Sequence, residues 1–151
     1  MNQLKRILLA EDDRRDVELT LNALSENHLA NEVIVARDGT EAWDYLMCQG
    51  KFAGRQAGNP TVMLLDLKMP KMDGLEVLRR LRAEPSLSAI PVVMLTSSNE
   101  ERDIVESYQL GVNAYVVKPV AFADFIAAVK NLGLFWAVLN QPPPTSIQRI
   151  A

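Results

Sequence analysis

Short apolar runs alternate with longer segments of helical periodicity along this sequence, and that alternation restricts the fold more than any other feature. Five apolar runs are each flanked by charged or turn-forming residues; these runs are residues 7–10, 33–36, 62–65, 92–95 and 114–117. Runs as short and as uniformly apolar as these are typical of strands that are buried on both faces of a parallel sheet.

The segments that follow the runs repeat apolar residues every three or four positions, as an amphipathic helix does. These segments are residues 17–24, 42–46, 75–81, 104–108 and 122–129. Asp13 and Asp73 are expected to cap the first and third helices, and Gly111 follows the fourth. Because strand and helix alternate five times, the sequence predicts an α/β domain with a doubly wound, five-stranded parallel sheet and helices on both faces.

The composition predicts a soluble, cytoplasmic protein that binds neither nucleic acid nor membrane. The net charge is −3, so there is no broad basic surface for nucleic acid. Cys48 is the only cysteine, which excludes an internal disulfide and suits a reducing compartment. The longest apolar stretch, residues 134–139, is far too short to span a bilayer.

Charged and polar side chains stand at the ends of the predicted strands. Because the carboxyl ends of parallel strands lie along one edge of a sheet, these side chains are expected to converge there. They are Glu11, Asp12 and Asp13 after the first strand, Asp66 after the third, Thr96 and Ser97 after the fourth, and Lys118 after the fifth. Carboxylates packed together repel one another unless a cation is present, and an all-oxygen set of ligands suits Mg²⁺.

Asp66 is also a candidate nucleophile, because a carboxylate can attack phosphorus and form an aspartyl phosphate. Lys118 and a metal ion would then balance the charge on the phosphoryl oxygens, and the Thr96 hydroxyl would donate to the same oxygens. The residues at this edge are therefore those that phosphoryl transfer requires.

Four sequence motifs indicate the family to which these residues are similar. ILLAED, LLDLKMPKMDG, VVMLTSS and AYVVKP, in this order and each at the end of a predicted strand, resemble the receiver domain of two-component response regulators over residues 4–131. The resemblance implies a flavodoxin-like fold with strand order 2-1-3-4-5. It assigns residues 1–131 to the receiver domain and leaves residues 132–151 as a C-terminal helix extension and proline-containing tail.

The resemblance also implies a function and a role for each residue. A histidine kinase would phosphorylate Asp66, and the protein would then signal by a change in shape; it would not be a conventional enzyme, since it catalyses only its own phosphorylation and dephosphorylation. Asp66 and Asp12 resemble direct ligands of Mg²⁺, for which Mn²⁺ or Ca²⁺ can substitute. The backbone carbonyl of Lys68 resembles the third protein ligand, and Glu11 resembles a residue that acts on the metal through water.

Three further residues match the part of the family motif that binds phosphate and transmits the signal. Lys118 and Thr96 resemble the groups that bind the phosphoryl oxygens. Thr96 and Tyr115 resemble the switch pair, in which Tyr115 takes the inward space that Thr96 leaves. The bond between Lys118 and Pro119 is expected to be cis by the same resemblance.

The loop at 49–60 and the segment NLGLFWAVLNQPPP resemble, more narrowly, stand-alone regulators that are paired with cyanobacterial phytochromes. A bacterial phytochrome is therefore a candidate for the kinase, which would dock near the first helix. With no basic recognition helix, the output is expected to pass through another protein, which the sequence does not identify. Large apolar residues near the C-terminus predict a homodimer; they are Phe122, Phe125, Leu134, Phe135, Trp136 and Leu139.

Three alternatives remain open from the sequence. An aspartate-nucleophile phosphatase of the haloacid dehalogenase type would need an acid two residues after Asp66, where Lys68 stands. A nucleotide- or flavin-binding domain would need a glycine-rich phosphate loop after a strand, and the sequence has none. A degenerate receiver that binds partners without phosphorylation would not need the complete set of acids, threonine and lysine.

Overall fold

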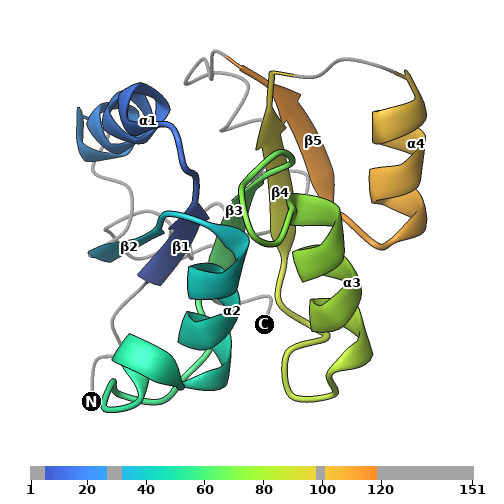
Figure 1. The fold of residues 1–151 in the computed structure, drawn as a ribbon. Helices are drawn as coiled ribbons and strands as arrows, with labels where there is room; N and C mark the ends of the chain where they lie inside the picture. The colour runs from blue at the N-terminus through green and yellow to red at the C-terminus, as the bar shows by residue number, and fades with distance from the viewer. Residues whose placement is uncertain (1–5, 27–31, 98–100, 119–151) are drawn as a thin grey trace, which may run out of the picture.

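The computed structural model describes residues 6–26, 32–97 and 101–118 (Figure 1). The elements in chain order are β1 (Arg6–Ala10), α1 (Arg14–Glu26), β2 (Glu32–Ala36), α2 (Gly39–Met47), η1 (Gly50–Phe52), β3 (Val62–Asp66), α3 (Gly74–Ala83), β4 (Val92–Thr96), α4 (Glu101–Gln109) and β5 (Ala114–Val117). The predicted strands and the first four predicted helices are therefore confirmed, and each strand begins and ends within one residue of the expected position.

All the strand pairs are parallel, and the strand order is β2-β1-β3-β4-β5, as predicted. The register aligns the carboxyl ends of the strands: Ala10 pairs with Leu65, and Thr96 pairs with Val117. The residues that follow each strand therefore begin at the same edge of the sheet.

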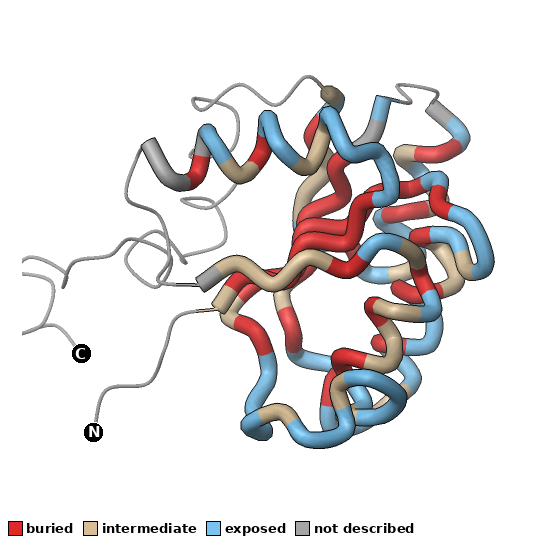
Figure 2. Tube along the Cα trace, turned by 60° about the vertical axis from the view of Figure 1, so that its left-hand side comes forward, coloured by how far each residue is buried: buried red, intermediate tan, exposed pale blue. Residues whose placement is uncertain are grey.

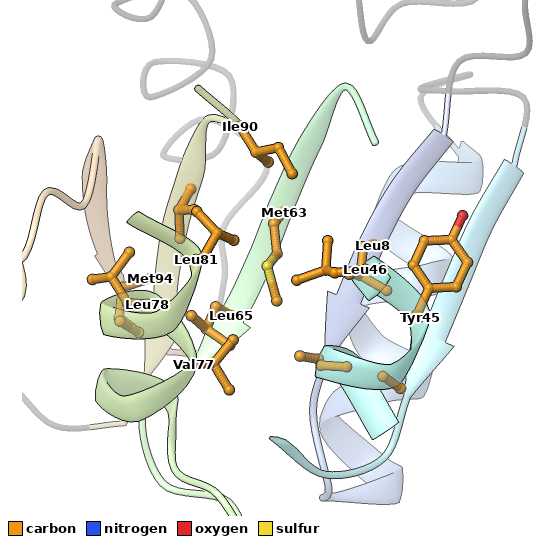
Figure 3. Packing of buried hydrophobic residues seen from close by; sticks show 14 of the residues in the cluster. Leu8, Tyr45, Leu46, Met63, Leu65, Val77, Leu78, Leu81, Ile90 and Met94 are labelled. Atoms are coloured by element: carbon orange, nitrogen blue, oxygen red, sulfur yellow. The ribbon is translucent and has the colours of Figure 1, made fainter. Parts of the chain in front are cut away.

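Two apolar clusters lie on opposite faces of the sheet, because successive residues of a strand point to opposite faces. On one face, Leu8 and Leu65 pack against α2 and α3 (Figure 3). On the other face, Leu9 and Leu64 belong to a cluster that includes Leu24 of α1. Buried residues are concentrated in the strands beneath α1 (Figure 2), and α4 lies beside β5 (Figure 1). The described helices thus cover both faces.

The helix starts follow local hydrogen-bonding rules. Asp13 and Asp73 cap α1 and α3 as predicted: the Asp13 carboxylate accepts from the Asp16 N–H at 3.0 Å, and the Asp73 carboxylate accepts from the Glu76 N–H at 2.9 Å. Such caps satisfy N–H groups that have no partner within the helix. Gly111, which follows α4, has a φ of 93°, a conformation that side chains disfavour.

The stretch 49–60, expected to be a loop, contains the short helix η1 and packs on Tyr45 of α2. The Arg55 guanidinium lies 3.9 Å from the centre of the Tyr45 ring, and Arg6 donates to the Tyr45 hydroxyl at 3.1 Å. Because Arg6 is the first residue of β1, this segment lies at the amino edge of the sheet, away from the carboxylates.

Several predictions concern residues that the structure does not describe. The fifth predicted helix, Pro119, every residue of the predicted dimer interface and the extension 132–151 lie outside the described residues. Among the helices that are described, none combines the length and the apolar character needed to cross a membrane.

Candidate functional site

Three carboxylates meet at the carboxyl edge of the sheet. Glu11 and Asp12 directly follow β1, and Asp66 is the last residue of β3. One oxygen from each of the three residues lies within 4.8 Å of the others. The Glu11 N–H donates to the carbonyl of Ala36 at 2.9 Å, which continues the β1–β2 pairing and positions the acidic segment. The convergence expected from the strand ends is therefore present for these acids.

Lys118 brings its ammonium group to the same place from the end of β5. Its Nζ forms an ion pair with Glu11, lies 3.0 Å from an Asp16 carboxylate oxygen and lies 3.4 Å from Oδ1 of Asp66. Only 12% of the Lys118 side chain is exposed. The predicted neighbours Glu11, Asp66 and Lys118 are thus in one cluster.

Sequence reasoning missed Asp16, which lies in the first turn of α1 and contacts Lys118. The sequence showed Asp16 only as an acid in the first turn of the helix, because Asp12 precedes the N-cap Asp13 and the i, i+4 rule does not connect it to Asp16. Acidic residues in a first helical turn are common, because they interact favourably with the helix dipole. Only the position of Lys118 distinguishes Asp16 from such a residue.

The electrostatics of the cluster combine burial with an excess of negative charge. The pKa of Asp66 is raised to about 7, chiefly by burial and next by the negative charge of Glu11, while Lys118 opposes the rise. Burial alone would lower the pKa of Lys118, but hydrogen bonds to Glu11 and Asp16 and the charge of Asp66 outweigh it, so the pKa lies above its ordinary value. A single ammonium group therefore does not neutralise the acids around it.

This arrangement fits a hard divalent cation. Every candidate ligand atom in the cluster is a carboxylate oxygen, the type that Mg²⁺ prefers. Glu11 is already engaged, because one oxygen pairs with Lys118 and the other accepts from the Asp13 N–H at 3.1 Å. Asp12, which is exposed, and Asp66 are therefore the better placed direct ligands.

The loop between β3 and α3 turns sharply beside Asp66. The Gly74 N–H donates to the Leu67 carbonyl at 2.8 Å, and Lys71 has a φ of 70°. A Cβ at position 74 would collide with the Asp66 carbonyl oxygen and would lie 2.9 Å from Cα of Leu67. Gly74 therefore permits the turn that follows Asp66; sequence reasoning did not single it out, although it follows the predicted cap Asp73.

The remaining predicted site residues lie around this cluster. Lys68 is exposed in the loop after Asp66. Thr96 ends β4, beside Leu95, which pairs with Asp66; the position of the Thr96 side chain is outside what the structure describes. Tyr115 is half-buried in β5 and packs against the cluster on the α2–α3 face. Pro119 lies beyond the described residues, so the predicted cis bond stays a prediction.

A doubly wound parallel sheet with acids and a lysine along its carboxyl edge is the arrangement expected of the receiver class of signalling domains. The sequence matches the family described as the response regulator receiver domain over residues 7–130, so the chain belongs to this family. The family is one of signalling proteins rather than conventional enzymes.

Individual relatives agree with the narrower resemblance. The chain is 39% identical to response regulator Rcp1 of Synechocystis sp. (strain ATCC 27184 / PCC 6803 / Kazusa) over 135 residues, which cover 89% of this chain and 90% of Rcp1. The bacteriophytochrome response regulator RtBRR shares 63% identity with a TM-score of 0.83, covering 97% of this chain and 88% of RtBRR.

Two further solved structures describe states of related regulators. The Mn²⁺-bound form of Rcp1 has a TM-score of 0.74 and 38% identity, covering 93% of this chain and 99% of that one. The phosphorylated cyanobacterial phytochrome response regulator RcpA has a TM-score of 0.74 and 41% identity, covering 89% and 94%. The comparisons thus identify this chain as a receiver-type response regulator similar to phytochrome response regulators.

Proposed function

We propose that this protein accepts a phosphoryl group from a histidine kinase on Asp66, with Mg²⁺, and signals to another protein by a change in shape. The observation that carries the proposal is the meeting of Asp66 with Glu11, Asp12 and Lys118 at one edge of the sheet. Asp66 is 6% exposed. It lies between the carboxylates of Glu11 and Asp12 and the ammonium group of Lys118.

The chemistry is a transfer from nitrogen to oxygen. An oxygen of the Asp66 carboxylate attacks the phosphorus of a kinase phosphohistidine. The new O–P bond forms as the P–N bond breaks, and the electron pair of the P–N bond returns to the imidazole nitrogen. Lys118 offsets the charge of the phosphoryl oxygens, because its ammonium already lies 3.4 Å from Asp66. Attack by water on the acyl phosphate returns the protein to its resting state.

Asp12, Asp66 and the Lys68 carbonyl are the proposed metal ligands, with Glu11 acting through water. A divalent cation bound there supplies positive charge against the phosphoryl oxygens. The relative Rcp1 has been solved with Mn²⁺, which supports an oxygen-ligand site for hard divalent ions in this group of proteins. Mg²⁺ is the proposed ion in this chain, with Mn²⁺ or Ca²⁺ able to substitute.

Thr96 and Tyr115 are the proposed switch. Thr96 belongs to β4, which separates the strand of Asp66 from the strand of Tyr115. A new doubly charged group on Asp66 would draw the threonine hydroxyl, and Tyr115 would repack on the surface formed by α4 and β5. A partner protein that binds this surface would then distinguish the phosphorylated state from the unphosphorylated state.

A phytochrome is the proposed kinase partner, since RtBRR and RcpA are described as response regulators of phytochromes. The kinase would dock near α1, whose first turn borders the site. We further propose a cytoplasmic location, a receiver domain at residues 1–131 and a homodimer formed through the C-terminal extension; these parts rest on the sequence.

Incubation of the full chain with acetyl phosphate and Mg²⁺, followed by intact mass measurement, tests the function. A mass gain of one phosphate in the wild type that is absent in Asp66→Asn supports it. No gain in the wild type would refute phosphorylation at Asp66. Rapid turnover of small phosphate esters would instead favour the aspartate-nucleophile phosphatase.

A further inference from the structure

Asp16 holds Lys118 more closely than Asp66 does. The distance from Lys118 Nζ to Asp16 Oδ2 is 3.0 Å, whereas the distance to Asp66 Oδ1 is 3.4 Å. The Asp16 side chain is 31% exposed and that of Lys118 is 12% exposed, so their contact lies at the rim of the site. Asp16 is not among the residues to which the family resemblance assigned a role.

Asp16 is itself well positioned by its own helix. Its N–H donates to the Asp13 carboxylate at 3.0 Å, which is the cap of α1. Glu11, the other close partner of Lys118, is also held, because its second oxygen accepts from the Asp13 N–H at 3.1 Å. Both anchors of the ammonium group are therefore tied to the same short segment between β1 and α1.

Lysine needs such anchors because its ammonium is a point charge on a flexible four-carbon stem. The ammonium has three N–H donors. Two of them are used by Glu11 and Asp16, and the remaining direction is toward Asp66. An ammonium fixed in this way stabilises the charge of the phosphoryl oxygens on Asp66 without first losing conformational freedom.

We propose that Asp16 is a positioning residue that, together with Glu11, fixes the Lys118 ammonium for the phosphoryl group on Asp66. The inference rests on the proposed phosphorylation of Asp66 and adds a residue to it. It also links α1 to the end of β5 through one ion pair.

A purely electrostatic role would have the opposite sign. The negative charge of Asp16 lies near the site and would repel an incoming phosphoryl donor, so its removal would speed phosphorylation if charge alone mattered. Anchoring predicts slower phosphorylation on removal. The direction of the rate change therefore separates the two roles.

The experiment measures the rate of Asp66 phosphorylation in the full chain, by intact mass, with acetyl phosphate at saturating Mg²⁺. Asp16→Ala is expected to slow the reaction about tenfold, the effect of losing one charge-assisted hydrogen bond. Asp16→Asn keeps an acceptor oxygen and is expected to fall between Asp16→Ala and the wild type. Glu18→Ala, which removes an exposed acid of the same helix, is the matched control and is expected to keep the wild-type rate.

A double-variant cycle tests whether Asp16 acts through the lysine. In a Lys118→Ala background, Asp16→Ala is expected to cause no further loss, whereas a second loss of the same size would show that Asp16 acts independently. If Lys118→Ala takes up no phosphate, the comparison of Asp16→Ala with Glu18→Ala decides: a rate equal to or above that of the control overturns the inference. Failure of the wild type to gain phosphate refutes the proposed function instead.

Discussion

The ammonium nitrogen of Lys118 lies 3.4 Å from Oδ1 of Asp66, although β4 separates the strands to which the two residues belong. Lys118 follows an edge strand, and Asp66 ends the central strand. The lysine therefore reaches past the end of β4, where Thr96 stands. The contact with Lys118 therefore connects Asp66 to the edge strand β5 and to the surface beside α4.

The stability of the metal-free protein is expected to depend on Asp66 between pH 4 and pH 7. The pKa of Asp66 in the folded state is about 7, above its ordinary value of 3.8. The folded state therefore binds more protons than the unfolded state in this window, and stability falls as the pH rises through it. Urea unfolding in EDTA at pH 5 and pH 8 measures this, with a loss of about 1–3 kcal/mol at the higher pH. Asp66→Asn should flatten the dependence; an unchanged slope in that variant would contradict the assignment.

Addition of Mg²⁺ is expected to stabilise the protein at pH 8, because a ligand that binds only the folded state shifts unfolding by about 2.7 kcal/mol at 100 times its Kd. Asp12→Asn should abolish most of this gain, since Asp12 and Asp66 are the carboxylates with oxygens free of Lys118 and of Asp13. Thermal unfolding with and without Mg²⁺ is the measurement. Glu18→Gln serves as the control and should respond as the wild type does. An equal gain in Asp12→Asn would remove this residue from the metal site.

Gly74→Ala is expected to destabilise the fold by about 1–3 kcal/mol, because the added Cβ would meet the backbone of Asp66 and Leu67. The same substitution at Gly54 is the matched control. A Cβ there has no heavy atom within 4 Å, so stability should change by less than about 0.5 kcal/mol. Chemical denaturation of both variants gives the comparison, and similar midpoints would show that the turn after Asp66 can relax.

Arg82→Lys is expected to cost about 1–3 kcal/mol, whereas Arg79→Lys should be nearly neutral. Arg82 donates to the carbonyls of Ile90 and Gly111 at 2.7 Å, which ties α3 to the segments before β4 and after α4. A lysine has one nitrogen and cannot span these acceptors. Arg79 lies on an exposed helix face beside Glu76. Equal effects in urea unfolding would mean that the Arg82 contacts add no stability.

The predicted homodimer is tested by light scattering coupled to size exclusion. The wild type is expected to run as a dimer at micromolar concentration, and Trp136→Asp is expected to shift it to a monomer, because a charge opposes burial of the apolar surface. Trp43→Phe, at a half-buried position on α2, is the control. A wild type that is monomeric both with and without phosphorylation would refute the dimer.

The described strands and helices, and the convergence of charged residues at one edge of the sheet, could be predicted from local patterns in the sequence. Continuous apolar runs such as residues 62–65 indicate buried strands, and helical spacing indicates the helices between them. Once the strands are parallel, their carboxyl ends share an edge, which predicted that Asp12, Asp66 and Lys118 lie along it; the strand order that brings them together was implied by the family resemblance. Asp13 and Asp73 could be predicted as caps for the same local reason.

Tertiary structure alone decided which of several similar residues takes part in long-range contacts. In the sequence, Asp16 is an ordinary acidic residue of a first helical turn. Only the tertiary structure shows that it contacts Lys118, which follows β5. Arg79 and Arg82 are arginines of the same helix, and no local pattern distinguishes them. In the structure, Arg82 contacts two loops, whereas Arg79 faces solvent. The raised pKa of Asp66 likewise arises from burial. Periodicity records which side of an element is apolar, whereas these contacts depend on where distant elements meet in space.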